Sequence, residues 1–343
     1  MGLLSRVVPA DVLDAWFPPA PSVVEALRKN VVDLCRTSPE VHAGPLTRAI
    51  SMARRIPEDC IVAGAGSSAL IYMALPLLAD GRVALVLDPT YGEYANLLAP
   101  NRVERLRLNK ANSYLLDPAN LQDCSAGLVI LVNPNSPTGQ FIPRKLLEPV
   151  VRELAERKLV WIDETYIEYA GPDESLEQLA CQNPNVVVCK SMSKVYALSG
   201  LRVAYLVAHP TRVARFTALR PPWAVSLPAQ VCGAAALLES SYYATRYNET
   251  ADLRSSLGRE VESIGLNVTM GVINCILVHL PEGGATAREV AISCATHQVF
   301  LRDACSMGET MGSHTLRISV RDARENSRIV EVLKRSIGTC DRG

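Results

Sequence analysis

The chain has 343 residues, of which 48% are hydrophobic, and its 35 Lys and Arg residues balance its 35 Asp and Glu residues. This length allows two domains that share a large core. Zero net charge argues against binding to nucleic acid or to a membrane surface, because both normally need a basic excess. We therefore expect neither partner.

The cysteines and the N-terminal residues indicate the compartment. The ten cysteines are scattered and include no C-x-x-C pair, and the first residues, MGLLSRVVPADVLDAW, lack the apolar stretch of a signal peptide. We therefore expect reduced cysteines and a cytoplasmic protein. The five histidines are isolated from one another, so we expect no metal site.

Short apolar runs alternate with helix-like stretches in the middle of the chain. Helices are predicted over 68–79 and 143–157. Buried strands are predicted over 83–87, 128–132, 159–162, 186–189 and 203–207. This alternation predicts an α/β layer around a mostly parallel sheet.

The character of the sequence changes after about residue 220. A helix-rich region from 228 to about 264 precedes short strands near 273–280 and 316–320, and an amphipathic helix over 323–337 follows. This order predicts a smaller α+β domain, with which the N-terminal residues pack. We therefore divide the chain into a large domain, 45–220, and a small domain, 1–44 with 221–343.

Polar segments follow the predicted strands, where ligands bind in open parallel sheets. GAGSS (64–68) opens the first helix, so its free N–H groups suit an anion. A lone lysine at a strand end is usually solvated, and a lone aspartate there is usually a helix N-cap. Each segment alone is therefore weak evidence for a ligand site. Together they supply an anion cradle, an acid, a tyrosine, a lysine and an arginine, in DPTY (88–91), NPNSPTG (133–139), DETY (163–166), SMSK (191–194) and GLR (200–202).

These segments resemble fold-type I enzymes that use pyridoxal 5′-phosphate (PLP), in particular class I/II aminotransferases of the histidinol-phosphate aminotransferase and threonine-phosphate decarboxylase branch. The resemblance implies a large domain with a mostly parallel, seven-stranded sheet, a smaller α+β domain formed from both termini, and a homodimer. The matching segments keep the family's order: GAGSSALI (64–71), DPTYGEY (88–94), NPNSPTG (133–139), DETYIEY (163–169), SMSKVYALSGLR (191–202) and LRISV (316–320).

The resemblance implies roles for three catalytic residues. Lys194 corresponds to the lysine that forms the Schiff base with PLP and moves the substrate proton. Asp163 corresponds to the carboxylate that pairs with the pyridine nitrogen and keeps it protonated. Tyr166 corresponds to the phenol that bonds the ring oxygen.

The resemblance also implies a set of cofactor-binding residues. Tyr91 corresponds to the aromatic residue that stacks on the ring. A helix N-terminus, two hydroxyls and one arginine would hold the phosphate group. These phosphate-binding residues are Gly66, Ser67, Ser68, Ser191, Ser193 and Arg202.

The substrate residues are partly like those of the family. Arg317 corresponds to the arginine that binds the anionic group of the substrate. Arg302 resembles a second anion-binding arginine, and its alternative is a surface ion pair with Asp303. Trp16 and Phe17 replace a polar substrate-binding segment, and either contact the substrate or anchor the N-terminus.

Two further departures concern the cofactor and the neighbouring subunit. The family's asparagine before Pro-Thr-Gly is Ser136 here, so either Ser136 or the preceding Asn135 contacts the ring oxygen. Ser38 stands where the family has a tyrosine that the neighbouring subunit contributes. These departures weaken the case for histidinol phosphate itself as the substrate.

We therefore predict a PLP-dependent aminotransferase that acts on an amino acid or a phosphorylated amine and on an oxo acid, in a biosynthetic pathway. A PLP-dependent decarboxylase, lyase or cyclase is the alternative, because the same lysine, acid and arginine serve these reactions. A PLP-domain regulator would need a DNA-binding extension, for which the chain has no room. A nicotinamide dehydrogenase would need G-x-G-x-x-G, which GAGSS is not.

Overall fold

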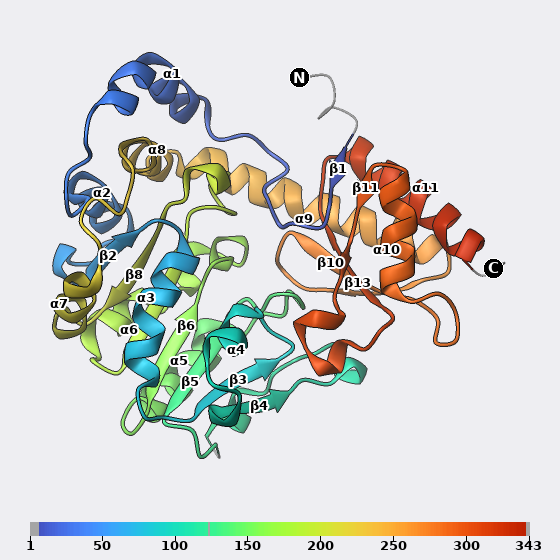
Figure 1. Cartoon of the computed structure of the whole chain (residues 1–343), viewed down its shortest axis with the longest axis horizontal. Helices are drawn as coiled ribbons and strands as arrows, with labels where there is room; N and C mark the ends of the chain where they lie inside the picture. The colour runs from blue at the N-terminus through green and yellow to red at the C-terminus, as the bar shows by residue number, and fades with distance from the viewer. Residues whose placement is uncertain (1–6, 123, 341–343) are drawn as a thin grey trace.

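A seven-stranded sheet forms the larger part of the computed structural model, which describes residues 7–122 and 124–340 (Figure 1). The strand order is β2-β8-β7-β6-β5-β3-β4, and β8 alone runs antiparallel to its neighbours. This confirms the mostly parallel sheet. Its strands are β2 (Ile61–Gly64), β3 (Ala84–Asp88), β4 (Val103–Arg107), β5 (Leu128–Val132), β6 (Leu159–Asp163), β7 (Val186–Ser191) and β8 (Ala204–Ala208).

Helices cover both faces of this sheet, which is why its central strands are apolar throughout. Alternate residues of β5 face opposite sides: Val129 and Leu131 belong to one hydrophobic cluster, and Leu128 and Ile130 to the other. The helices are α1 (Pro21–Arg36), α2 (Gly44–Arg54), α3 (Ser67–Ala79), α4 (Glu93–Leu97), α5 (Arg144–Leu154), α6 (Glu177–Gln182), α7 (Pro210–Leu219) and α8 (Leu227–Leu237).

A second, antiparallel sheet of four strands has the order β12-β13-β10-β9. Its strands are β9 (Asn267–Met270), β10 (Cys275–His279), β12 (Arg302–Asp303) and β13 (Thr315–Ser319). β1 (Val8–Pro9) pairs separately with β11 (Val299–Phe300), so the N-terminus lies against this part of the chain. The helices of this part are α9 (Ser240–Ser263), α10 (Ala287–Thr296) and α11 (Ala323–Cys340).

The long helix α9 begins beside the large sheet and extends to the small one (Figure 1). The division at residues 44 and 220 stays a prediction. Val8 and Ala10 belong to the core of the small sheet, whereas Phe17 and Val23 belong to a core of the large sheet. Among the described residues, no helix is long and apolar enough to cross a lipid bilayer.

Candidate active site

A cavity of about 160 Å³ lies where β5, β6 and β7 end. The sequence predicted all its lining residues except Val132 and Thr165. The cavity is where an open parallel sheet is expected to bind its ligand. Its walls consist of Ser67, Ser68, Tyr91, Val132, Ser136, Asp163, Thr165, Tyr166, Ser191, Ser193, Lys194 and Arg202.

Asp163, the last residue of β6, is the buried acid of the cavity. Its Oδ1 accepts a hydrogen bond from the backbone N–H of Thr165 (2.9 Å), and its Oδ2 accepts one from the hydroxyl of Tyr94 (2.7 Å). Trp161 Nε1 donates to the same Tyr94 hydroxyl (3.0 Å) and orients it. Burial raises the pKa of Asp163, although these hydrogen bonds act to lower it. A cationic ring nitrogen would stabilise this carboxylate.

An anion cradle lies at the N-terminus of α3. Gly66 has φ 91°, and the helix begins at the next residue, Ser67. The first N–H groups of a helix have no intrahelical partner and favour a phosphate. A Cβ atom on Gly66 would lie 2.5 Å from Arg202 Nη2, so the glycine leaves the space that the guanidinium needs.

Arg202 and the residues after β7 complete this cradle. Ser191 ends β7, and Ser193 follows two residues later. Arg202 donates to Ser193 Oγ (3.4 Å) and to the carbonyl of Ser199 (2.9 Å). No carboxylate of the described residues lies within 4.0 Å of Arg202. The cradle therefore keeps a positive charge for an anionic ligand.

Lys194 lines the cavity, and 25% of its side chain is exposed. Its Nζ donates to Asp14 Oδ1 over 2.6 Å, and the hydroxyl of Ser199 donates to the same oxygen over 2.7 Å. Burial acts to raise the pKa of Asp14, but these hydrogen bonds leave it below its usual value. Asp14 belongs to none of the sequence motifs that predicted the site.

Tyr91 and Tyr166 are the aromatic residues of the cavity. Tyr91 is 37% exposed, and its ring meets that of Tyr94 edge to face at 5.9 Å. Tyr166 is buried, and burial raises the pKa of its phenol, so it stays protonated as a donor.

The two candidates for the ring-oxygen contact, Asn135 and Ser136, take different positions. Ser136 lines the cavity. Asn135 instead donates to the carbonyl of Pro89 (3.1 Å) and to Thr138 Oγ1 (3.0 Å), and Thr90 donates to its Oδ1 (3.3 Å). Asn135 therefore fixes the loop, and Ser136 is the residue of this pair that lies at the site.

Arg317 and Arg302 lie opposite each other in β13 and β12. Arg317 is 8% exposed, donates to the carbonyl of Asp11 (2.7 Å), and has a buried Nε with no hydrogen-bond partner. Arg302 is exposed, and the structure contains no Arg302–Asp303 ion pair. Burial lowers the pKa of Arg317, and an anionic ligand would oppose that change.

Trp16 packs on α9 and is not among the residues that line the cavity. Its Nε1 donates to Thr250 Oγ1 (2.8 Å), and its ring meets Phe17 edge to face at 5.7 Å. Arg246 lies over the Trp16 ring at 5.9 Å from the centroid. These contacts fit the anchoring role for Trp16, and its contact with the substrate stays a prediction.

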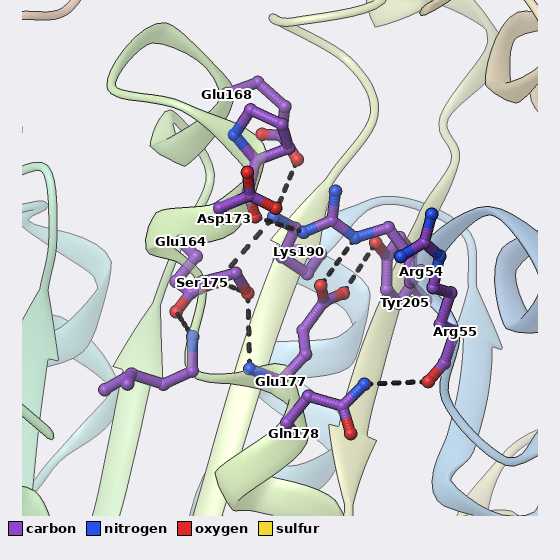
Figure 2. A network of polar contacts seen from close by, with 12 residues as sticks. Arg54, Arg55, Glu164, Glu168, Asp173, Ser175, Glu177, Gln178, Lys190 and Tyr205 are labelled. Atoms are coloured by element: carbon purple, nitrogen blue, oxygen red, sulfur yellow. Dashed lines mark hydrogen bonds and ion pairs between the residues drawn. The ribbon is translucent and has the colours of Figure 1, made fainter. Parts of the chain in front are cut away.

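A buried network of charges joins the segment between β6 and β7 to β7 itself, to β8 and to the end of α2 (Figure 2). Lys190 of β7 is 2% exposed, donates to Glu168 Oε1 (2.7 Å) and lies 3.7 Å from Glu164 Oε2. Glu177 bonds Arg54 (2.6 Å) and the hydroxyl of Tyr205 (2.9 Å). Because side chains alternate along a strand, Lys190 points away from the cavity that Ser191 lines.

The residues present fit PLP in three respects. Asp163 offers a buried carboxylate to the ring nitrogen, and the start of α3 with Arg202 offers an anion cradle to the phosphate. Lys194 lines the same cavity, so its amine lies beside the space that the cofactor would occupy. Tyr94 and Asp14 also contact these residues, although neither was predicted from the sequence. Tyr94 could have been predicted from its position in DPTYGEY, three residues after Tyr91.

Comparison with known proteins agrees with this fit. Histidinol-phosphate aminotransferases of Rhodopseudomonas palustris and an Anaeromyxobacter species are 28% and 29% identical, over 92% and 93% of this chain and 87% and 88% of theirs. The solved Sinorhizobium meliloti enzyme in complex with PLP has a TM-score of 0.84 at 22% identity, covering 97% of this chain and 91% of its own.

The L-threonine-O-3-phosphate decarboxylase of Porphyromonas gingivalis shares the fold, with a TM-score of 0.83 at 19% identity over 96% of this chain and 99% of its own. The family model for aminotransferase class I and II matches residues 19–333. The chain therefore belongs to the class I and II aminotransferases, and it is an enzyme that uses PLP.

Proposed function

We propose that this aminotransferase takes its amino group from a primary amine that carries a phosphate or a carboxylate, and passes it to an oxo acid. The observation that carries the proposal is the pair Arg302 and Arg317, which lie directly opposite in antiparallel strands. Opposite residues project from the same face of a sheet. No carboxylate of the described residues lies within 4.0 Å of either guanidinium, so both can bind a ligand anion.

The names of the relatives support a phosphorylated amine. The histidinol-phosphate aminotransferases and the threonine-O-3-phosphate decarboxylase are both named for phosphorylated compounds. Two adjacent arginines supply two charges, which suits a phosphate dianion better than a single carboxylate. A biosynthetic role follows from the same relatives as a proposal.

Each residue then has one task in the reaction. Bound PLP supplies an electron sink for the charge that develops at the substrate Cα. Asp163 would hold the proton at the ring nitrogen, and Tyr166 would donate to the ring oxygen. Arg317 orients the substrate, and Lys194 takes and returns the proton at Cα.

The test is an absorbance spectrum of the purified protein with PLP, titrated with amino acids and phosphorylated amines in the absence of an oxo acid. An amine that converts the cofactor stoichiometrically to its amino form is the donor. Release of CO₂ with unchanged cofactor absorbance would instead identify a decarboxylase. Lys194→Ala should abolish turnover, and Lys145→Ala, an exposed lysine of α5, is the control.

We also infer a homodimer in the cytoplasm. The supporting observation is the exposed segment around Ser38, which occupies the place of a residue that the family's neighbouring subunit contributes. Helix α1 also exposes Val24, Val31 and Val32, which a partner would cover. Light scattering after gel filtration measures the mass directly, and a monomer at micromolar concentration would contradict the inference.

A further inference from the structure

Asp14 contacts Lys194 but has no role in the reaction described above. Its Oδ1 accepts hydrogen bonds from Lys194 Nζ (2.6 Å) and from Ser199 Oγ (2.7 Å). The hydroxyl of Ser199 also lies 3.1 Å from the carbonyl of Ser193, the residue that precedes Lys194. The carboxylate is thus tied to both the lysine and the loop that carries it.

The segment that carries Asp14 is fixed without any help from Lys194. The carbonyl of Leu13 accepts a hydrogen bond from the buried side chain of Asn274 (3.1 Å). Trp16 donates to Thr250 (2.8 Å), and the carbonyl of Asp11 accepts from Arg317 (2.7 Å). These contacts lie on both sides of Asp14. Its place therefore does not depend on whether Lys194 is a free amine.

We propose that Asp14 is a positioning residue that keeps a negative charge beside the Lys194 nitrogen when that nitrogen is linked to PLP. This inference rests on the proposed function, because it assumes that PLP attaches to Lys194. A carboxylate at hydrogen-bond distance favours the protonated, cationic form of that nitrogen. With PLP attached, a protonated nitrogen would withdraw more electron density from the adjacent carbon than a neutral one.

The other charged groups near this pair do not replace Asp14. Asp163 is the carboxylate that lines the cavity, and it is already bonded to Tyr94 and Thr165. Arg321, which follows β13, acts on Asp14 as a neighbouring cation. Because 45% of the Asp14 side chain is exposed, solvent screens part of its charge. Arg321 is the other cation that acts on Asp14, and the titratable or charged residues that line the cavity with Lys194 are Tyr91, Asp163, Tyr166 and Arg202.

The test is a pH titration of the absorbance of the bound cofactor in the wild type and in Asp14→Asn. The pH midpoint of the spectral change reports the protonation of the linking nitrogen and does not depend on turnover. Removing the carboxylate should lower this midpoint by about one pH unit. Asp14→Glu should restore most of the difference, since it keeps the charge.

Asp33→Asn is the matched control, because it removes one charge from an exposed residue of α1 whose ion-pair partner, among the residues that the structure describes, is Arg36 alone. Its midpoint should equal that of the wild type. An unchanged midpoint in Asp14→Asn would overturn the inference and leave the proposed function intact. A wild type whose bound cofactor shows no absorbance of a lysine linkage would overturn the proposed function itself.

Discussion

Tyr94 donates a hydrogen bond to Asp163 over 2.7 Å inside the protein, where the hydroxyl and the carboxylate are both buried. Trp161 donates to the same hydroxyl from the strand that ends in Asp163. This short chain of donors stabilises the charged form of an acid whose burial opposes ionisation. These hydrogen bonds therefore offset part of the cost of burying its charge.

Tyr94→Phe tests this relationship. The change leaves Asp163 Oδ2 and Trp161 Nε1 without their shared partner, so the free energy of unfolding should fall by about 1–3 kcal/mol. The affinity for PLP should also fall, because a less ionised Asp163 binds the ring nitrogen more weakly. Urea unfolding and a fluorescence titration with PLP measure the two effects. Tyr72→Phe, which removes an exposed hydroxyl bonded to Glu93, should change neither.

Arg317→Ala should weaken the binding of anionic substrates by about 2–5 kcal/mol, because the guanidinium is buried and its charge has no carboxylate partner in the described chain. Arg302→Ala should weaken phosphorylated amines more than those with a carboxylate alone. KM values for matched amines with and without a phosphate measure the difference. Arg324→Ala, on the exposed start of α11, is the control. Equal losses for both substrate classes would show that Arg302 does not select the phosphate.

Asn135→Ala and Ser136→Ala should separate the two roles in this loop. Loss of the three Asn135 hydrogen bonds should lower the free energy of unfolding by about 1–3 kcal/mol. Ser136→Ala should leave stability unchanged and alter the affinity for PLP, since its side chain lines the cavity. Thermal unfolding of the cofactor-free protein and PLP titration distinguish these outcomes. The opposite pattern would assign the cofactor contact to Asn135.

Glu164 makes stability depend on pH. Burial raises its pKa in the folded protein to about 7 from the usual 4.5, against the attraction of Lys190. Between pH 4.5 and pH 7, Glu164 keeps its proton in the folded chain and has lost it in the unfolded chain. The contribution of Glu164 to the free energy of unfolding is therefore present below pH 4.5 and is lost as the pH rises through 7.

Glu164→Gln should remove this dependence. The decrease in the free energy of unfolding between pH 5 and pH 8 should then be smaller than in the wild type, by about 1–3 kcal/mol. Urea unfolding at the two pH values measures it. Glu156→Gln, an exposed residue next to α5, should keep the wild-type decrease. If Glu164→Gln also keeps the wild-type decrease, another group of the network in Figure 2 causes the pH dependence.

Local patterns in the sequence were sufficient to predict the centre of the fold and of the site. Apolar runs such as 128–132 identify buried strands, and the polar residues after them, including Asp163 and Lys194, meet because parallel strands end at one edge. The edge strands β2 and β4 were not predicted. β2 has only four residues, and β4 (VERLR) is polar because the edge faces solvent.

The remaining site residues depend on tertiary contacts that no local pattern contains. Asp14 meets Lys194 because the N-terminal segment is bound by Asn274 and Arg317, which come late in the chain. The choice between Asn135 and Ser136 depends on how one loop folds against Pro89 and Thr90. In both cases the sequence shows the residue type but not the direction in which its side chain points.

The contact between Asp14 and Lys194 joins residues 180 positions apart. The cavity also needs the start of α3, the ends of three strands and the loop before β8. A partly folded chain therefore lacks the binding site, and PLP binds only the complete native state. By mass action, PLP at 100 times its dissociation constant adds about 2.7 kcal/mol to the free energy of unfolding. A higher PLP concentration should therefore protect this chain against proteolysis, because it lowers the unfolded fraction.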